Sequence, residues 1–142
     1  MQVDSKYLKF WLSDIEYLFS VFSTQTLDKD NSKKRRIFID NGGDVLFVAH
    51  LDTVQTPQYF GQTTNRIYAS GLDDRLGAYT AIELVRQGYN ADILLTDGEE
   101  SMKSTAQYHK LKDYNWIVEF DRQGDDVVHY DLASQELEDN LR

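Results

Sequence analysis

Residues 76–100 read LGAYTAIELVRQGYNADILLTDGEE, and this stretch indicates the class of fold. Apolar residues recur at three- and four-residue spacings over 76–87, and Gly88 follows at the position where helices commonly end. Residues 92–95 form a short, mostly apolar run before a polar turn, which is typical of a buried strand. A helix that leads directly into a buried strand is typical of α/β proteins.

Further helices and strands are predicted on both sides of this unit. A turn reading Asn-Gly-Gly-Asp at 41–44 favours a hairpin between strands 36–40 and 45–49. The other expected elements are helices over 5–22, 101–111 and 133–141, strands over 66–70, 116–120 (buried) and 127–130, and loops over 23–34 and 51–65. Their alternation predicts one domain over 1–142, of the α/β class, with a mixed and largely parallel sheet.

The composition fits one folded domain and excludes several classes of function. Of the 142 residues, 41% are apolar and 13% aromatic, which is enough to build a core. The formal net charge of -9 argues against a nucleic-acid partner, because phosphate binding needs a clustered cationic face. The chain has no cysteine, so any metal ion would be held by histidine and carboxylate side chains.

Neither a signal peptide nor a membrane segment is expected. Charged residues such as Asp4 and Lys6 interrupt the apolar pattern of the N-terminal segment. No stretch approaches the ~20 consecutive apolar residues that a membrane helix needs. We therefore expect a cytoplasmic protein without a membrane partner.

Acidic and histidine residues gather just beyond the ends of four predicted strands. They are His50 and Asp52 after strand 45–49, Asp73 after strand 66–70, Glu99 and Glu100 after strand 92–95, and Asp121 after strand 116–120. Open α/β sheets bind ligands beyond the carboxyl ends of their strands. Four segments of one chemical type at that position predict a common site.

His50, Asp52 and Asp73 each suit a role in binding cations. His50 and Asp52 are two residues apart, so their side chains project to the same side. The carboxylate of Asp52 can then accept a hydrogen bond from one ring nitrogen while the other binds a metal ion. Asp73 can give one oxygen to each of two cations. The alternatives are a solvated His50–Asp52 pair and an Asp73 that caps the following helix.

The remaining acids suit complementary roles. Of the adjacent Glu99 and Glu100, one can bind a metal ion while the other takes a proton from water. Both can instead be acids that favour a helix N-terminus. Asp121 ends an apolar strand, where an unpaired charge is costly, and an ion pair with Arg122 is its alternative.

The charges favour a joint site. If Asp73, Glu100 and Asp121 converge, their repulsion raises the carboxyl pKa values and destabilises the fold unless cations lie between them. Two divalent cations would balance these carboxylates and a hydroxide. An imidazole with carboxylates suits zinc best, with cobalt or manganese as alternatives.

The ordered motifs HLD at 50–52, GLDDRLG at 71–77, TDGEE at 96–100 and EFDRQG at 119–124 resemble a known family. They are similar to those of the co-catalytic dizinc exopeptidases and aminoacylases, a superfamily of zinc aminopeptidases, carboxypeptidases and deacylases. The resemblance covers residues 36–131. It implies a three-layer α/β/α sandwich with two adjacent zinc ions.

The resemblance also implies residue roles. His50 and Asp121 would bind one zinc ion, Glu100 the other and Asp73 both, while Asp52 would orient His50. Glu99 would be the general base in the hydrolysis of an amide bond of a peptide or acylamino acid. A cis peptide bond is expected between Asp73 and Asp74.

The chain departs from the family in one ligand. The family has a further histidine near the C-terminus, whereas this chain has only His109 and His129 besides His50. We expect His109 on a helix surface and His129 on a sheet face, neither on a metal, and relatives would continue beyond Arg142.

Three explanations stay open. The protein is short and binds one zinc ion, or two weakly; or a second chain, such as another copy in a homo-oligomer, supplies the histidine; or the chain is a degenerate relative kept as a metal-binding or interaction protein. The presence of Glu99 favours an enzyme. Its substrate specificity would come from the loops 51–65 and 122–126, where Tyr59, Phe60 and Arg122 are the candidates.

Overall fold

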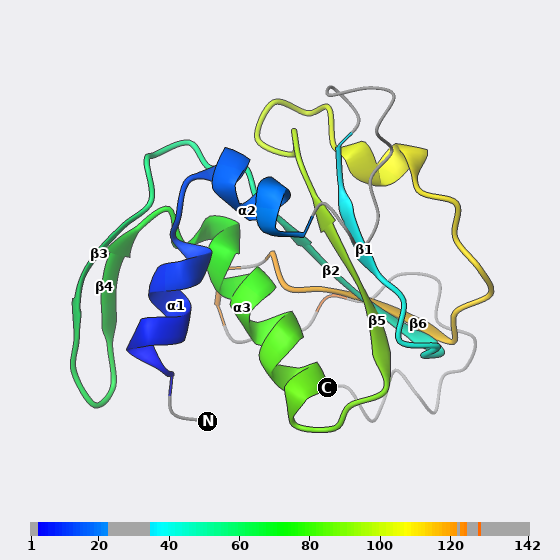
Figure 1. Cartoon of the computed structure of the whole chain (residues 1–142), viewed down its shortest axis with the longest axis horizontal. Helices are drawn as coiled ribbons and strands as arrows, with labels where there is room; N and C mark the ends of the chain where they lie inside the picture. Colours follow the sequence, from blue (N-terminus) through cyan, green and yellow to red (C-terminus); the bar gives the residue numbers. More distant parts are fainter. Residues whose placement is uncertain (1–2, 23–34, 122, 125–127, 129–142) are drawn as a thin grey trace.

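The computed structural model describes residues 3–22, 35–121, 123–124 and 128 (Figure 1). The predicted loop 23–34 and helix 133–141 lie outside the described residues, as does His129. Of the predicted strand 127–130, only Val128 is described.

A four-stranded sheet in the order β1-β5-β2-β6 forms the centre of the fold. Its strands are β1 (Ile37–Ile39), β2 (Val45–His50), β5 (Ala91–Thr96) and β6 (Trp116–Glu119). β2 pairs in parallel with both β5 and β6, whereas β1 pairs antiparallel with β5. The fold is thus α/β with a mostly parallel sheet, as predicted.

The predicted hairpin over 36–49 is wrong, because β5 lies between β1 and β2. The turn that joins these two strands is held instead by Asp92 of β5. Asp92 Oδ1 accepts hydrogen bonds from the backbone N–H groups of Asn41 (2.9 Å) and Gly43 (3.0 Å). A Cβ atom at Gly43 would lie 2.7 Å from Ala91 Cα, so glycine permits the chain to cross the end of β5 at close range.

The helix α3 (Leu72–Arg86) covers one face of this sheet, packing on β2 and β5. Asp73 and Asp74 have non-helical backbone angles within this range, so the regular helix starts at Arg75, close to the start of the predicted helix 76–87. Gly88 follows it with a φ of 101°, as expected of a residue that ends a helix. Alternate side chains of β2 and β5 face α3 and fill the main core. The apolar residues of this core include Phe47, Ala49, Ile93, Leu95, Ala78 and Ala81.

The N-terminal segment forms two helices, α1 (Ser5–Trp11) and α2 (Ile15–Val21), instead of the single helix predicted over 5–22. The apolar spacing continues through both, so it does not reveal the break. Asp14 starts α2 by accepting hydrogen bonds from the backbone N–H groups of Glu16 and Tyr17. The buried guanidinium of Arg75 donates to the carbonyls of Trp11 and Ser13 and so satisfies the end of α1.

Two further predictions need correction. The loop predicted over 51–65 contains β3 (Gln58–Gln62), which pairs antiparallel with β4 (Ile67–Ser70) in a separate two-stranded sheet. The strand predicted over 66–70 is therefore not part of the main sheet. The helix predicted over 101–111 is only a short 3-10 helix, η2 (Thr105–Tyr108), because the preceding backbone folds into a tight turn.

β6 is also more exposed than predicted, with Trp116 37% and Ile117 53% exposed, because it is an edge strand of the sheet.

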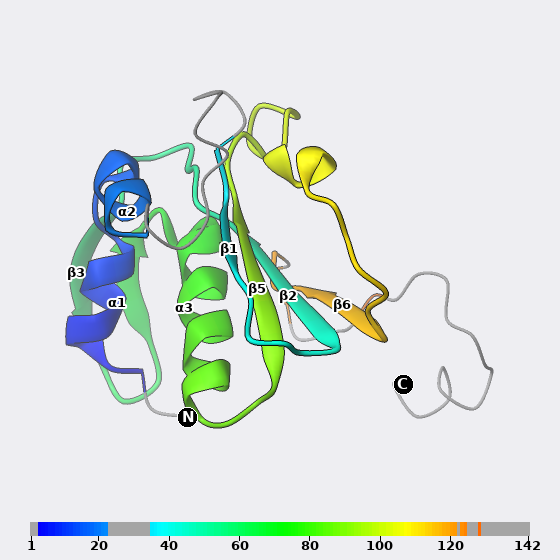
Figure 2. The same cartoon turned by 45° about the vertical axis from the view of Figure 1, so that its right-hand side comes forward.

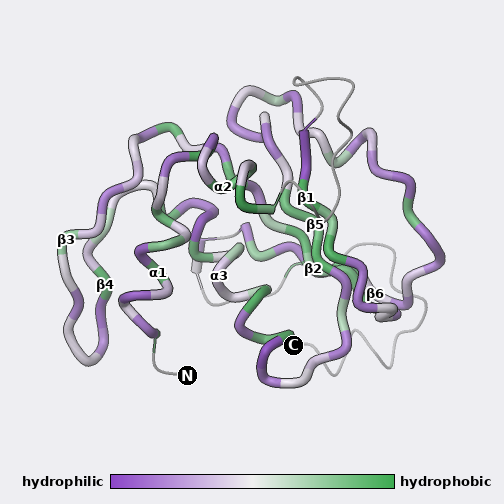
Figure 3. Tube along the Cα trace, viewed as in Figure 1, coloured by the Kyte–Doolittle hydropathy of each residue, from purple (hydrophilic) through white to green (hydrophobic). Residues whose placement is uncertain are grey.

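The layers are easiest to follow in Figure 2. α3 lies against the sheet, and α1 packs on the side of α3 that faces away from the sheet, next to β3. Figure 3 shows the hydrophobic residues concentrated along β2 and β5. Within the described ranges, no helix combines the length and apolar character that crossing a bilayer demands.

Candidate metal centre

The carboxyl ends of the three parallel strands meet at one edge of the sheet. His50 is the last residue of β2, the turn with Glu99 and Glu100 follows β5, and Asp121 follows β6. Because β2 lies between β5 and β6, His50 stands between these two acidic segments. Asp73 reaches the same place from the first turn of α3 rather than from a strand of this sheet.

His50 is the buried residue of the site, and the acids lie around its ring. Its Nε2 lies 3.3 Å from Asp73 Oδ1, 3.6 Å from Asp121 Oδ2 and 3.7 Å from Glu99 Oε2. The imidazole side chain is only 2% exposed, whereas the side chain of Asp73 is 73% exposed. The acids therefore stand between the buried ring and solvent, where an ion can enter.

Two groups of side chains can each hold a metal ion. One consists of His50, Glu99 and Asp121 and the other of His50, Asp73 and Glu100, and the ligand atoms within each group all lie within 4.8 Å of one another. An imidazole nitrogen with carboxylate oxygens is a donor set that suits zinc. The residues present thus fit the metal that the sequence predicts, and the four predicted ligands and the predicted base Glu99 all belong to these two groups, which share His50.

Asp52 contacts His50 through both its backbone and its side chain. The backbone carbonyl of Asp52, not its carboxylate, accepts the closest hydrogen bond from His50 Nδ1, at 2.8 Å. The carboxylate lies 3.6 Å from Nδ1 and accepts hydrogen bonds from the backbone N–H groups of Glu99 (3.2 Å) and Glu100 (3.0 Å). Although burial opposes it, the side-chain hydrogen bond with His50 and the backbone hydrogen bonds from Glu100 and Glu99 lower the pKa of Asp52. Asp52 therefore orients both the imidazole ring and the turn that carries the glutamates.

Asp74 has a supporting position that the sequence analysis did not assign. It is only 4% exposed, and its carboxylate accepts hydrogen bonds from the backbone N–H groups of His50 (3.3 Å) and Gly77 (3.1 Å). A Cβ atom at position 77 would lie 2.0 Å from Asp74 Oδ1, so the glycine in GLDDRLG leaves room for this carboxylate. The peptide bond between Asp73 and Asp74 is cis, as expected from the resemblance.

The electrostatics of the site are those of crowded acids around one imidazole. Burial lowers the pKa of His50, but hydrogen bonds to Asp52 and the charges of Asp74 and Asp121 outweigh it and raise the pKa to about 9. Burial raises the pKa of Asp121 to about 6, helped by a hydrogen bond with Asp73 and by the charges of Asp73 and Glu99. Burial likewise raises the pKa of Asp74 to about 7.

No lysine or arginine among the described residues forms an ion pair with the acids that face His50. Arg75 follows Asp74 in sequence but donates to backbone carbonyls, including that of Leu51. Arg122, which the sequence analysis considered as a partner of Asp121, lies outside the described residues. Within the described part of the chain, His50 is thus the one basic side chain that these acids face.

His109 belongs to neither candidate group. It lies half-buried at the end of η2, with its ring 4.5 Å from the ring of Phe38, so the predicted exposed helical position is wrong. Burial and the charge of Arg36 lower its pKa. His50 is accordingly the histidine of both candidate groups among the described residues.

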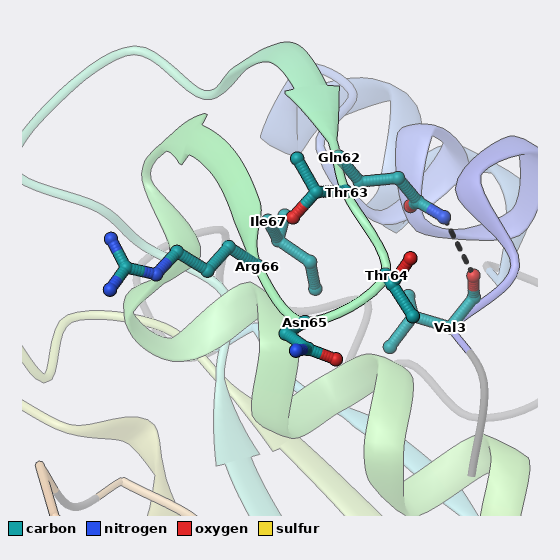
Figure 4. Close-up of a pocket in the computed structure, with 7 residues that line it drawn as sticks. All are labelled: Val3, Gln62, Thr63, Thr64, Asn65, Arg66 and Ile67. Atoms are coloured by element: carbon teal, nitrogen blue, oxygen red, sulfur yellow. Dashed lines mark hydrogen bonds between the residues drawn. The ribbon is translucent and has the colours of Figure 1, made fainter.

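A hollow at the turn between β3 and β4 has a different character (Figure 4). It is lined by Val3 and the turn residues 62–67, and Gln62 Nε2 donates a hydrogen bond to the carbonyl of Val3 at 3.3 Å. Its lining contains neither a carboxylate nor a histidine, so it offers no ligands for a metal ion.

Comparison with known proteins identifies no relative. No family model matches the chain, and neither the curated proteins nor the solved structures return a match. The function must therefore be argued from the residues of this chain.

Proposed function

We propose that this chain is a zinc-dependent hydrolase of the co-catalytic dizinc exopeptidase and aminoacylase superfamily. It would cleave an amide bond of a peptide or acylamino acid. One observation carries the proposal: the buried Nε2 of His50 faces oxygens of Asp73, Glu99 and Asp121 within 3.7 Å, and no lysine or arginine among the described residues pairs with these three acids, so a single imidazole faces three carboxylates. An acidic cluster of this kind is costly unless it binds cations.

The proposed ligand assignment follows the resemblance. His50 and Asp121 would hold one zinc ion and Glu100 the other, with Asp73 contributing to both. The proposal includes the three-layer α/β/α sandwich of that superfamily, of which α3 would be one outer layer. Cobalt or manganese would suit the same ligands.

Glu99 is the proposed general base. Bound zinc supplies an acidified water and a polarised substrate carbonyl. The Glu99 carboxylate, 3.7 Å from His50 Nε2 and 41% exposed, can take a proton from that water and deliver it to the leaving amine. Asp52 fixes the backbone N–H of Glu99 and so keeps the carboxylate at the site.

A second candidate is a metal-binding or interaction protein without catalysis. It is favoured by the single histidine in both candidate groups among the described residues, where the superfamily uses a further one. A second chain that supplies a histidine would restore the enzyme. The two candidates differ in turnover and not in metal binding.

The test is turnover of a panel of aminoacyl and acylamino-acid amides by the zinc-loaded chain. Glu99→Gln should lower kcat at least about 100-fold while zinc stays bound, because a general base contributes about that much. Glu119→Gln, at an exposed position on β6, is the matched control and should keep full activity. Bound zinc without turnover at any protein concentration would favour the binding protein instead.

A further inference from the structure

The turn that carries Glu99 and Glu100 is anchored at its start by a residue far away in sequence. Because β1 runs antiparallel to β5, the chain just before β1 lies beside the chain just after β5. Arg35 thereby meets Asp97, and its Nε donates a hydrogen bond to Asp97 Oδ2. Both side chains are mostly buried, 21% and 20% exposed.

Arg35 also connects this turn to the N-terminal helices. Its Nη1 donates to Glu16 Oε1 at 2.6 Å, and its guanidinium carbon lies 4.5 Å from the centre of the Phe19 ring. Both partners belong to α2. An arginine with a carboxylate on each side and a ring against its face has few alternative orientations, so it is a fixed anchor for Asp97.

Asp97 in turn sets the path of the glutamates. Its backbone N–H donates to Thr105 Oγ1 (2.9 Å), and its carbonyl accepts from the N–H of Thr105 (2.8 Å). Gly98 follows with a φ of 79°, and a Cβ there would lie 2.7 Å from the carbonyl oxygen of Lys103, so the turn is tight. Asp97 and Asp52 therefore hold the turn from opposite ends, with Glu99 between them.

We propose that Arg35 is a positioning residue of the metal centre: through Asp97 it fixes the turn that presents Glu99 and Glu100 to His50. It also pairs the Asp97 carboxylate, two residues before Glu99, and so keeps this acid out of the ligand set. The inference rests on the proposed function, because it assigns Arg35 a role toward the metal ions.

The experiment measures Co²⁺ binding to the full-length chain by calorimetry and visible absorption, with Co²⁺ as a spectroscopic substitute for zinc. Arg35→Met should weaken Co²⁺ binding about tenfold and change the absorption bands, because groups that orient metal ligands typically contribute 10- to 100-fold in affinity. Asp97→Asn should likewise weaken Co²⁺ binding and change the absorption bands, although the asparagine side chain has almost the same size and shape as the aspartate that it replaces. Arg35→Lys, which keeps the charge, should recover part of the affinity.

Arg86→Met is the matched control. Arg86 likewise pairs with a glutamate, Glu83 (3.2 Å), and lies over a ring, that of Tyr7 (4.7 Å), but it belongs to the far end of α3. It should leave Co²⁺ affinity and spectrum unchanged, even if both variants lose similar thermal stability. The inference would be overturned if Arg35→Met and Asp97→Asn kept the Co²⁺ affinity and absorption bands of the wild type. It would also be overturned if Arg86→Met weakened Co²⁺ binding as much as Arg35→Met does. Either result would leave the proposed function standing. A wild-type chain that binds no Co²⁺ would overturn the proposed function with it.

Discussion

Acidic side chains lie at both ends of β5, but their surroundings differ. At the start of the strand, Asp92 is fully buried and accepts hydrogen bonds from Asn41, Gly43 and the hydroxyl of Tyr114 (2.7 Å). Lys112 Nζ completes its surroundings at 2.7 Å. At the other end, the acids around His50 have no lysine or arginine partner among the described residues.

The pKa directions follow this difference. Burial acts to raise the pKa of Asp92, but Lys112, Tyr114 and the backbone N–H groups outweigh it and lower the pKa. Burial raises the pKa of Asp121 to about 6, and the neighbouring acids add to the rise. A buried acid with a complete set of protein donors is part of the structure, whereas Asp121 shares the one imidazole of His50 with two other acids and so has an incomplete set. The comparison predicts opposite responses to mutation at the two ends.

The largest effect on stability is expected at the start of β5, where Asp92 lies. Asp92→Ala should lower the free energy of unfolding by about 3 kcal/mol, because it leaves buried backbone and tyrosine donors without an acceptor. Urea denaturation measures this loss. Asp44→Ala, which removes an exposed carboxylate bonded to Asn115, should cost under about 1 kcal/mol. Zinc affinity should be unchanged in both variants, and a large drop in Asp92→Ala would contradict the separation of the two ends.

At the other end of β5, where the acids surround His50, bound zinc should stabilise the folded chain. A free zinc concentration of one hundred times Kd should raise the free energy of unfolding by about 2.7 kcal/mol, because the ion binds the folded state. His50→Ala should abolish this gain, since it removes the residue that both groups share. His109→Ala, at the ring contact with Phe38, should keep it. Thermal or urea unfolding with and without zinc decides between these outcomes.

Zinc affinity should depend steeply on pH. The pKa of His50 is raised to about 9, so below that pH a zinc ion must displace a proton from the ring. Affinity should rise about tenfold per pH unit, or roughly 100-fold from pH 6.5 to 8.5, as measured by competition with a chromophoric chelator. Constant affinity over this range would argue that His50 is not a ligand.

The smallest effect has the opposite sign to that at Asp92. The folded-state pKa of Asp121 is raised above its ordinary value, so in the zinc-free chain its contribution to stability is full below pH 3.8 and is lost as pH rises through about 6. Asp121→Asn should therefore stabilise the zinc-free chain at pH 8, by about 1 kcal/mol once solvent screening is allowed for. Denaturation at pH 4 and pH 8 tests this. The same variant should bind zinc more weakly, and destabilisation at pH 8 would show that Asp121 is a structural acid like Asp92.

The sequence predicts the site better than it predicts the elements that carry it. His50, the Glu99 turn and Asp121 follow parallel strands, so the rule that carboxyl ends meet at one edge brings them together without any knowledge of strand order. That rule does not account for Asp73, because β4 lies in a separate sheet and α3 brings Asp73 to the edge instead.

The failures share a physical cause. The turn at 41–44 has the composition of a hairpin, but its partner is the carboxylate of Asp92, a contact about 50 residues distant that local pattern cannot contain. The break between α1 and α2 depends on Arg75 in the same way. The Asp52 carboxylate contacts His50 as expected, but it also accepts hydrogen bonds from the turn after β5, about 47 residues away, which local pattern does not contain. Long-range hydrogen bonds, not propensity, decide each case.

The most direct test of the account is the zinc content of the purified chain, measured by elemental analysis alongside its mass in solution. The account predicts one or two zinc ions per chain in the wild type and a loss of zinc in His50→Ala, with Asp44→Ala unaffected. A wild-type chain that holds no zinc after equilibration with the metal, or equal zinc in all three proteins, would contradict it.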